Sequence, residues 1–100
     1  MEQIERIRHM EDILRRGETV CRALEAALDS YEAILGEAEE LGAYYGSDAW
    51  FFDLDCDRAG LLPAGLRRGV LSEDEAYDFL TELHTLRERM QALSGPDEKE

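Results

Sequence analysis

The chain has 100 residues, of which 24 are acidic and 11 are basic, giving a formal net charge of −13 at pH 7. This length fits one small domain, and this charge repels the phosphates of nucleic acids and of anionic membranes. Direct binding to nucleic acid or to a membrane is therefore not expected. Two readings of the acidity remain: a highly soluble surface, or a mimic of nucleic acid that occupies a basic groove on another protein.

The sequence also bears on location. No apolar run is long enough to span a membrane, and the N-terminus lacks the hydrophobic region of a signal peptide. The two cysteines, Cys21 and Cys56, form no CxxC motif. The simplest inference is a reduced chain in the cytoplasm.

Residues 2–43 are predicted to form one long amphipathic helix. Apolar residues recur every seventh position on three neighbouring lines, which makes a stripe wider than the seam of a two-stranded coiled coil. The lines are Ile7, Leu14, Cys21, Leu28 and Leu35; Met10, Leu24, Tyr31 and Ala38; and Ile13, Val20, Ala27, Ile34 and Leu41. Such a stripe indicates a helix that packs against more than one neighbour.

The remaining surface of this helix carries acidic residues that precede arginines by four positions, the favourable order for ion pairs on a helix. These predicted pairs are Glu2–Arg6, Glu11–Arg15, Asp12–Arg16 and Glu18–Arg22. Gly17 follows two arginines and could end one helix and begin another. The seven-residue phase nevertheless runs unbroken from Leu14 to Cys21, so we predict a continuous helix with any bend at Gly17.

Residues 44–71 lose the stripe and are predicted to form a crossover with little regular structure. Ser47 can cap a short helix, with Asp48 in its first turn. The crossover contains a group of aromatic residues: Tyr44, Tyr45, Trp50, Phe51 and Phe52. They can form a satellite core that closes the end of a helical hairpin, or they can line a surface for a partner or ligand.

A second, shorter helix is predicted from Ser72 to Leu93. Ser72 and Glu75 have the spacing of a capping box, in which each side chain bonds the backbone amide of the other residue. Gly95 and Pro96 end the helix. The predicted fold is therefore all-α: a single domain over residues 1–93, in which this helix packs back on the first as a hairpin, and a disordered acidic tail over residues 94–100.

The two predicted helices differ in length. About 42 residues span roughly 63 Å and about 21 residues span roughly 32 Å, so the second helix can cover only half of the first. A second copy, a break at Gly17 or a different protein could cover the rest. We hypothesise a homodimer. Its expected interface residues are Ile4, Ile7, Met10, Ile13 and Leu14.

Two blocks, YYGSDAW at residues 44–50 and GVLSEDEAYDFL at residues 69–80, carry a family resemblance. Over about residues 3–92 the chain resembles short bacterial proteins grouped as domain-of-unknown-function family 4298. The matching positions are Met10, Glu11, Leu41, Tyr44, Tyr45, Gly46, Ser47, Trp50, Asp53, Gly60, Leu62, Pro63, residues 69–74, Tyr77, Leu80 and Met90. The resemblance implies a small all-helical protein and supplies no activity; Gly17 departs from the pattern.

Three aspartates suggest a metal loop at first sight. Asp53, Asp55 and Asp57 match the first three ligand positions of a calcium-binding EF-hand. The sixth position is Arg58 where the motif needs glycine, and the twelfth is Ala64 where it needs glutamate. We therefore expect a solvated acidic loop with at most incidental cation binding, and no metal site or cofactor.

The sequence offers no convincing catalytic residue. His9 and His84 are the only imidazoles, and neither lies in a Glu-x-x-His pattern. Cys56 lies among aspartates, which disfavour its thiolate, and Cys21 lies on the apolar stripe, where a core position is expected. The only lysine is Lys99, in the predicted tail. A small enzyme is the least favoured reading.

Arg67 and Arg68 form the one compact basic spot. They can pair with nearby acids, or they can dock an acidic or phosphorylated partner. The favoured function is a non-catalytic protein–protein interaction or regulatory module with an unidentified protein partner. Its expected contact residues are Tyr44, Tyr45, Trp50, Phe51, Arg67 and Arg68. The alternative is the acidic mimic, because residues 37–57 contain seven acidic residues and no basic one.

Overall fold

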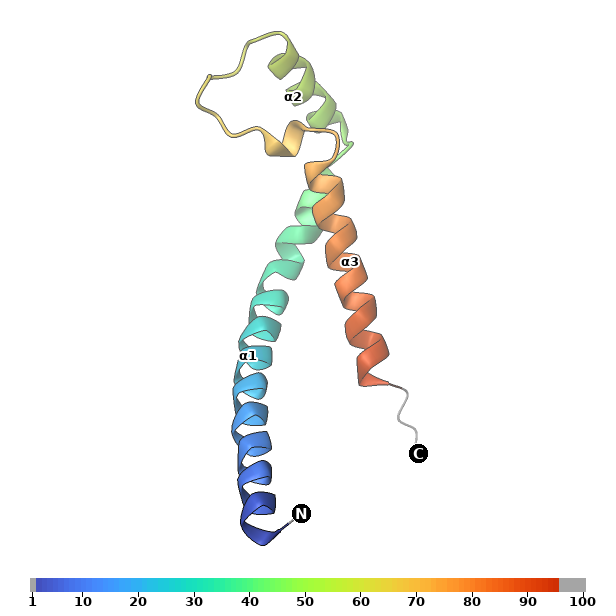
Figure 1. The fold of residues 1–100 in the computed structure, drawn as a ribbon. Coiled ribbons are helices and arrows are strands. Elements are labelled where there is room, and N and C mark those ends of the chain that lie inside the picture. Colours follow the sequence, from blue (N-terminus) through green and yellow to red (C-terminus); the bar gives the residue numbers. More distant parts are fainter. Residues whose placement is uncertain (1, 96–100) are drawn as a thin grey trace. The chain divides into compact units, whose positions relative to one another are not determined.

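The computed structural model describes residues 2–95 and is all-α over this range (Figure 1). It contains α1 (Gln3–Tyr44), α2 (Asp48–Arg58), the short 3-10 helix η1 (Gly69–Leu71) and α3 (Glu75–Ser94). The predicted fold class is confirmed. The predicted acidic tail lies, from residue 96 onward, outside the described residues.

The chain divides into two compact units, which are described separately. Unit 1 is Met1–Gly36 and contains the greater part of α1. Unit 2 is Glu37–Glu100 and contains the end of α1 together with α2, η1 and α3.

In unit 1, α1 continues through Gly17 without interruption. A side chain at Gly17 would meet no atom within 4 Å, so the glycine is not required for packing within the chain. The persistence of the seven-residue phase across Gly17 therefore predicted the continuity of the helix correctly.

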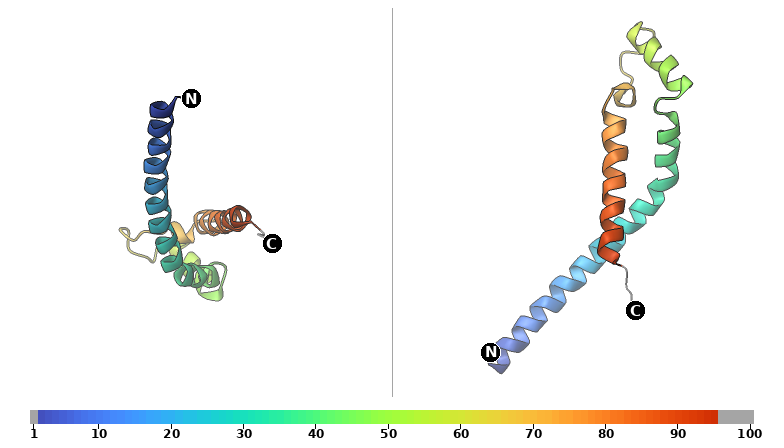
Figure 2. Two further views of the ribbon diagram at one scale, coloured as in Figure 1. Left: turned by 90° about the horizontal axis from the view of Figure 1, so that it is seen from below. Right: turned by 90° about the vertical axis from the view of Figure 1, so that its right-hand side faces the viewer.

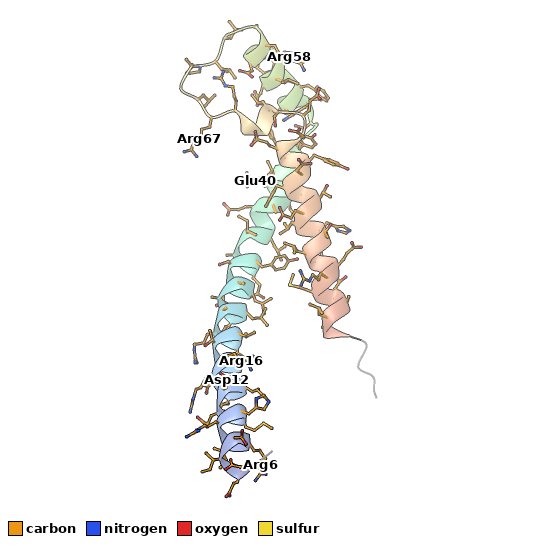
Figure 3. The ribbon with its side chains drawn as sticks, viewed as in Figure 1. Arg6, Asp12, Arg16, Glu40, Arg58 and Arg67 are labelled. Carbon is orange, nitrogen blue, oxygen red and sulfur yellow. The ribbon has the colours of Figure 1, made fainter. Side chains whose placement is uncertain are left out.

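Two of the four predicted ion pairs on α1 are confirmed. Arg15 contacts Glu11 at 3.2 Å, and Arg16 contacts Asp12 at 2.8 Å. Figure 3 labels Asp12 and Arg16 on neighbouring turns of α1. Glu18 pairs backward with Arg15 at 3.0 Å, so Arg15 holds two glutamates. The Glu2 carboxylate accepts a hydrogen bond from the Glu5 amide at 2.8 Å. These groups are exposed apart from Glu18, which is partly exposed. Each pair therefore contributes only about a few tenths of a kcal/mol, as is usual on helix surfaces.

The apolar stripe of unit 1 is exposed to solvent. Nine large apolar side chains in it have exposed fractions between 38% and 63%. They are Ile4, Ile7, Met10, Ile13, Leu14, Val20, Leu24, Leu28 and Ile34. Cys21 is also exposed and not in a core as expected, because the face on which it lies has no covering residues in this unit. We refer to these nine residues as the apolar stripe below.

In unit 2, α1 ends at a tight turn that leads into α2. Gly46 adopts a positive φ of 80°, which glycine tolerates without strain. The Ser47 hydroxyl then accepts a hydrogen bond from the Trp50 amide at 3.2 Å, which confirms Ser47 as the cap of α2. Asp48 lies in the first turn, where its charge complements the helix dipole.

The start of α3 follows only half of the predicted capping box. The Ser72 hydroxyl accepts from the Glu75 amide at 3.1 Å, as predicted. The Ser72 amide, however, donates to the Gly69 carbonyl at 3.0 Å, so it closes η1 and does not need the Glu75 carboxylate. α3 consequently begins at Glu75 and not directly after Ser72.

The core of unit 2 is small and lies where the crossover meets the helices. Trp50, Leu54 and Leu71 are buried, and Tyr44, Tyr45 and Leu62 pack against them. A second contact joins the end of α1 to α3: Ala38 and Ala76 are buried, and Leu80 lies 3.9 Å from the position of a Cβ at Gly42. α3 thus starts beside the last turns of α1 (Figure 2).

Candidate functional site

Trp50 is the centre of the crossover, but it is buried. Only 7% of the residue is exposed, and its indole N–H donates to the Val70 carbonyl at 2.7 Å. Its ring makes edge-to-face contacts with Tyr45, at a centroid distance of 5.1 Å, and with Phe51, at 4.9 Å. Trp50 therefore joins α2 to η1 and packs beneath Tyr45 and Phe51. Because it is buried, it is not accessible to a partner.

The two tyrosines at the end of α1 are also engaged within the unit. The Tyr44 hydroxyl donates to an Asp53 carboxylate oxygen of α2 at 2.6 Å. The Tyr45 hydroxyl donates to the Glu73 carbonyl, just before α3, at 2.6 Å. The two rings are half-buried, so their role in the structure is to fix α2 and the start of α3 to the end of α1.

The hydrogen bond to Asp53, reinforced by burial, raises the pKa of Tyr44 to about 12 from its ordinary value of 10.0. A raised pKa in the folded state means that the bond contributes fully to stability below about pH 10 and that this contribution is lost as the pH rises toward 12.

We expect Tyr44→Phe to lower the free energy of unfolding by about 1–2 kcal/mol at pH 8, because a partly exposed hydrogen bond to a carboxylate is lost. The difference between wild type and variant should shrink between pH 10 and pH 12. Urea unfolding of both proteins across this range measures it. A difference that stays constant to pH 12 would contradict the assigned role of the hydroxyl.

Phe51 and Phe52 provide the exposed aromatic surface of α2, with 54% and 68% of each residue exposed. Phe51 was predicted as a contact residue; Phe52 was not. The spacing of apolar residues in α2 could have predicted the exposure of both. Trp50 and Leu54 lie four residues apart on the buried side of the helix, which leaves Phe51 and Phe52 on other sides.

The two neighbouring arginines have different environments. Arg68 pairs with Asp57 of α2 at 3.0 Å and donates to the Pro63 carbonyl, so it holds the loop after α2 against that helix. Pairing with a nearby acid was predicted, and the acid proves to be Asp57. Arg67 is exposed and projects from the loop (Figure 3). Of the two, only Arg67 presents its guanidinium to a potential partner.

An open pocket of about 280 Å³ lies between the end of α1, η1 and α3. Its lining residues are Leu41, Arg67, Gly69, Val70, Glu75, Ala76 and Phe79. The Glu75 carboxylate lies over Gly69, with an oxygen 2.8 Å from the position a Cβ would take. The pocket therefore offers apolar side chains with one arginine and one glutamate among them.

The predicted acidic loop is wrong, because Asp53, Asp55 and Asp57 lie within α2. In a helix, residues two apart point to different sides, so Asp55 diverges from the other two. Asp53 is bound by Tyr44 and Asp57 by Arg68. Within residues 2–95, no group of three or more His, Cys, Asp and Glu side chains is placed to hold a metal ion.

Among the described helices, none has the length and apolar character needed to cross a membrane. Searches of curated proteins and of solved structures found no match to the chain. The model of one family, described as a domain of unknown function (DUF4298), matches residues 7–93, which include the crossover, the pocket and most of the apolar stripe. The chain therefore belongs to the DUF4298 family.

Proposed function

We propose that this protein is a non-catalytic protein-binding module and that one of its partners is a second copy of itself. The observation that supports this proposal is the exposed apolar stripe of α1, which continues well beyond the expected interface of Ile4, Ile7, Met10, Ile13 and Leu14. Contiguous apolar surface of this kind on a soluble protein marks an interaction site.

The size of the stripe makes self-association energetically reasonable. Full burial of one such side chain contributes roughly 1.5–3 kcal/mol, so covering a half-exposed one contributes on the order of 1 kcal/mol. Nine such residues in each copy offset the entropic cost of association, which is about 4–15 kcal/mol. We therefore expect a dimer at micromolar concentration.

Leu24→Glu is expected to weaken the dimer by roughly 100-fold or more, because it places a carboxylate in the middle of the apolar stripe of each copy. Ala26→Glu is the matched control. It adds the same charge two positions along the helix, at an exposed residue outside the stripe. Sedimentation velocity over a concentration series measures both. A monomeric wild type, or equal weakening by the two variants, would overturn self-association through this stripe.

The non-catalytic part of the proposal rests on the contacts of the charged side chains in unit 2. Asp53, Asp57 and Arg68 serve internal hydrogen bonds and ion pairs. The pocket beside α3 is open and mainly apolar, which suits an apolar side chain of a protein partner. Arg67 and Phe51 are the predicted contact residues that remain exposed for such a partner.

A mimic of nucleic acid receives less support. Of the seven acidic residues at positions 37–57, Asp57 is paired with Arg68, and one carboxylate oxygen of Asp53 accepts the hydroxyl of Tyr44. The acidic residues exposed near the end of α1 are Glu37, Glu39 and Glu40, and a test of mimicry would start from these three. Mimicry requires basic partners that high salt releases, whereas docking on apolar and aromatic residues persists in high salt.

A further inference from the structure

We propose that two copies associate with their α1 helices antiparallel, so that residues 10–20 of one copy lie along residues 25–35 of the other. This inference rests on the self-association proposed above and adds its direction and register. Two features of unit 1 favour it over a parallel pair: the distribution of charge along α1, and the position of Gly17 in the stripe.

Charge is distributed unequally along α1. Residues 2–22 contain five acidic residues and five arginines, and therefore carry no net formal charge. Residues 23–36 contain three acidic residues and no basic one, and the next basic residue is Arg58. A parallel pair places the two acidic segments together. An antiparallel pair places each acidic segment beside the neutral segment that holds all five arginines of α1, and so avoids the repulsion between the two acidic segments.

One border of the stripe shows the same unequal distribution of arginines along α1. Glutamates recur at one heptad position, Glu11, Glu18, Glu25 and Glu32. Arg15 binds the first two, at 3.2 Å and 3.0 Å. Arg22 lies three residues before Glu25, the spacing that Arg15 has to Glu18, whereas no arginine lies three or four residues from Glu32. In an antiparallel pair, equivalent borders lie side by side. The two glutamate borders then lie together, and Arg15, which adjoins its own border, runs beside Glu32 of the second copy and offsets their repulsion.

Gly17 sets the register. It lies on the central line of the stripe, between Met10 and Leu24, and the space that its side chain would fill is empty. In a parallel pair Gly17 would face Gly17 and leave a gap in the seam, which close packing disfavours. If facing residues have numbers that sum to about 45, Gly17 faces Leu28, Leu14 faces Tyr31 and Met10 faces Leu35. The gap at Gly17 is then filled by a large residue, Leu28.

Nitroxide spin labels test the direction. Ala26→Cys and Ala33→Cys are made separately in a Cys21→Ala, Cys56→Ser background, so that each copy carries one label. Both alanines are exposed and lie outside the stripe, so the labels should leave association intact. In the antiparallel pair, the two labels are separated along the axis by roughly 10 Å at position 26 and roughly 32 Å at position 33, at about 1.5 Å per residue.

Pulsed electron paramagnetic resonance is therefore expected to give a distance at position 33 that exceeds the distance at position 26 by more than roughly 10 Å. Equal distances would show a parallel pair and overturn the proposal, and a longer distance at position 26 would overturn its register. Sedimentation of the labelled proteins accompanies the measurement. If only the labelled variants lose the dimer, the helix face that carries residues 26 and 33 lies in the interface, and the proposal is overturned as well. A monomeric wild type would instead refute the self-association on which it rests.

Discussion

Trp50→Ala is expected to lower the free energy of unfolding of unit 2 by about 3–5 kcal/mol, which is the usual cost of removing a buried aromatic side chain. The variant loses the packing of Trp50 on Leu54 and Leu71, and it leaves the Val70 carbonyl without its 2.7 Å hydrogen bond. The core of this unit is small, so the loss approaches the full stability of a small domain.

Urea unfolding followed by far-ultraviolet circular dichroism measures this effect. Phe52→Ala removes an aromatic ring from the same helix at a residue that is 68% exposed, and it should cost less than about 1 kcal/mol. Trp50→Phe should lie between the two, because it keeps a ring in the core but loses the indole N–H. Equal midpoints for Trp50→Ala and Phe52→Ala would show that Trp50 does not hold the unit together.

This expectation changes the design of binding experiments. A partner lost by Trp50→Ala could be lost because unit 2 has unfolded. Phe51→Ala combined with Arg67→Ala alters two exposed residues. It removes the edge-to-face contact of Phe51 with Trp50 but leaves the buried contacts of Trp50 with Leu54 and Leu71 in place. Loss of a captured protein by this double variant, with unit 2 still folded by circular dichroism, would assign the binding surface to the crossover.

Leu71→Ala is expected to destabilise unit 2 by about 2–4 kcal/mol, because it opens a cavity beside Trp50 and Leu54. Leu71 is 8% exposed at the end of η1, so few neighbours can move to fill the space. Leu61→Ala is the matched control, since it removes the same atoms from a loop residue that is 72% exposed. The fluorescence of Trp50, the only tryptophan, reports both unfolding transitions. Similar midpoints for the two variants would contradict the assigned core.

The long-range periodicity of the sequence predicted the helices well. The stripe indicated a helix over residues 2–43, and the structure has it over Gln3–Tyr44, with Gly17 inside it. Ser47 was identified as a cap from its own chemistry and its place before Asp48. These features depend on residues within a few positions of one another, and local patterns encode them directly.

Contacts between distant segments were harder to predict. Nothing local indicates that Arg68 returns to Asp57, or that Tyr45 reaches the Glu73 carbonyl 28 positions later. The burial of Trp50 also depends on η1, which supplies the Val70 carbonyl. The capping box was misjudged for a different, local reason: the Ser72 amide donates to the Gly69 carbonyl, three positions earlier, and closes η1.

The hydroxyls of the adjacent residues Tyr44 and Tyr45 bind two different segments. Neighbouring residues on a helix project about 100° apart, so one tyrosine reaches α2 and the other reaches the segment before α3. A rotation of the last turn of α1 about its axis would stretch both bonds at once. Any reorientation of the end of α1 would therefore disturb its contacts with α2 and with the segment before α3 at the same time.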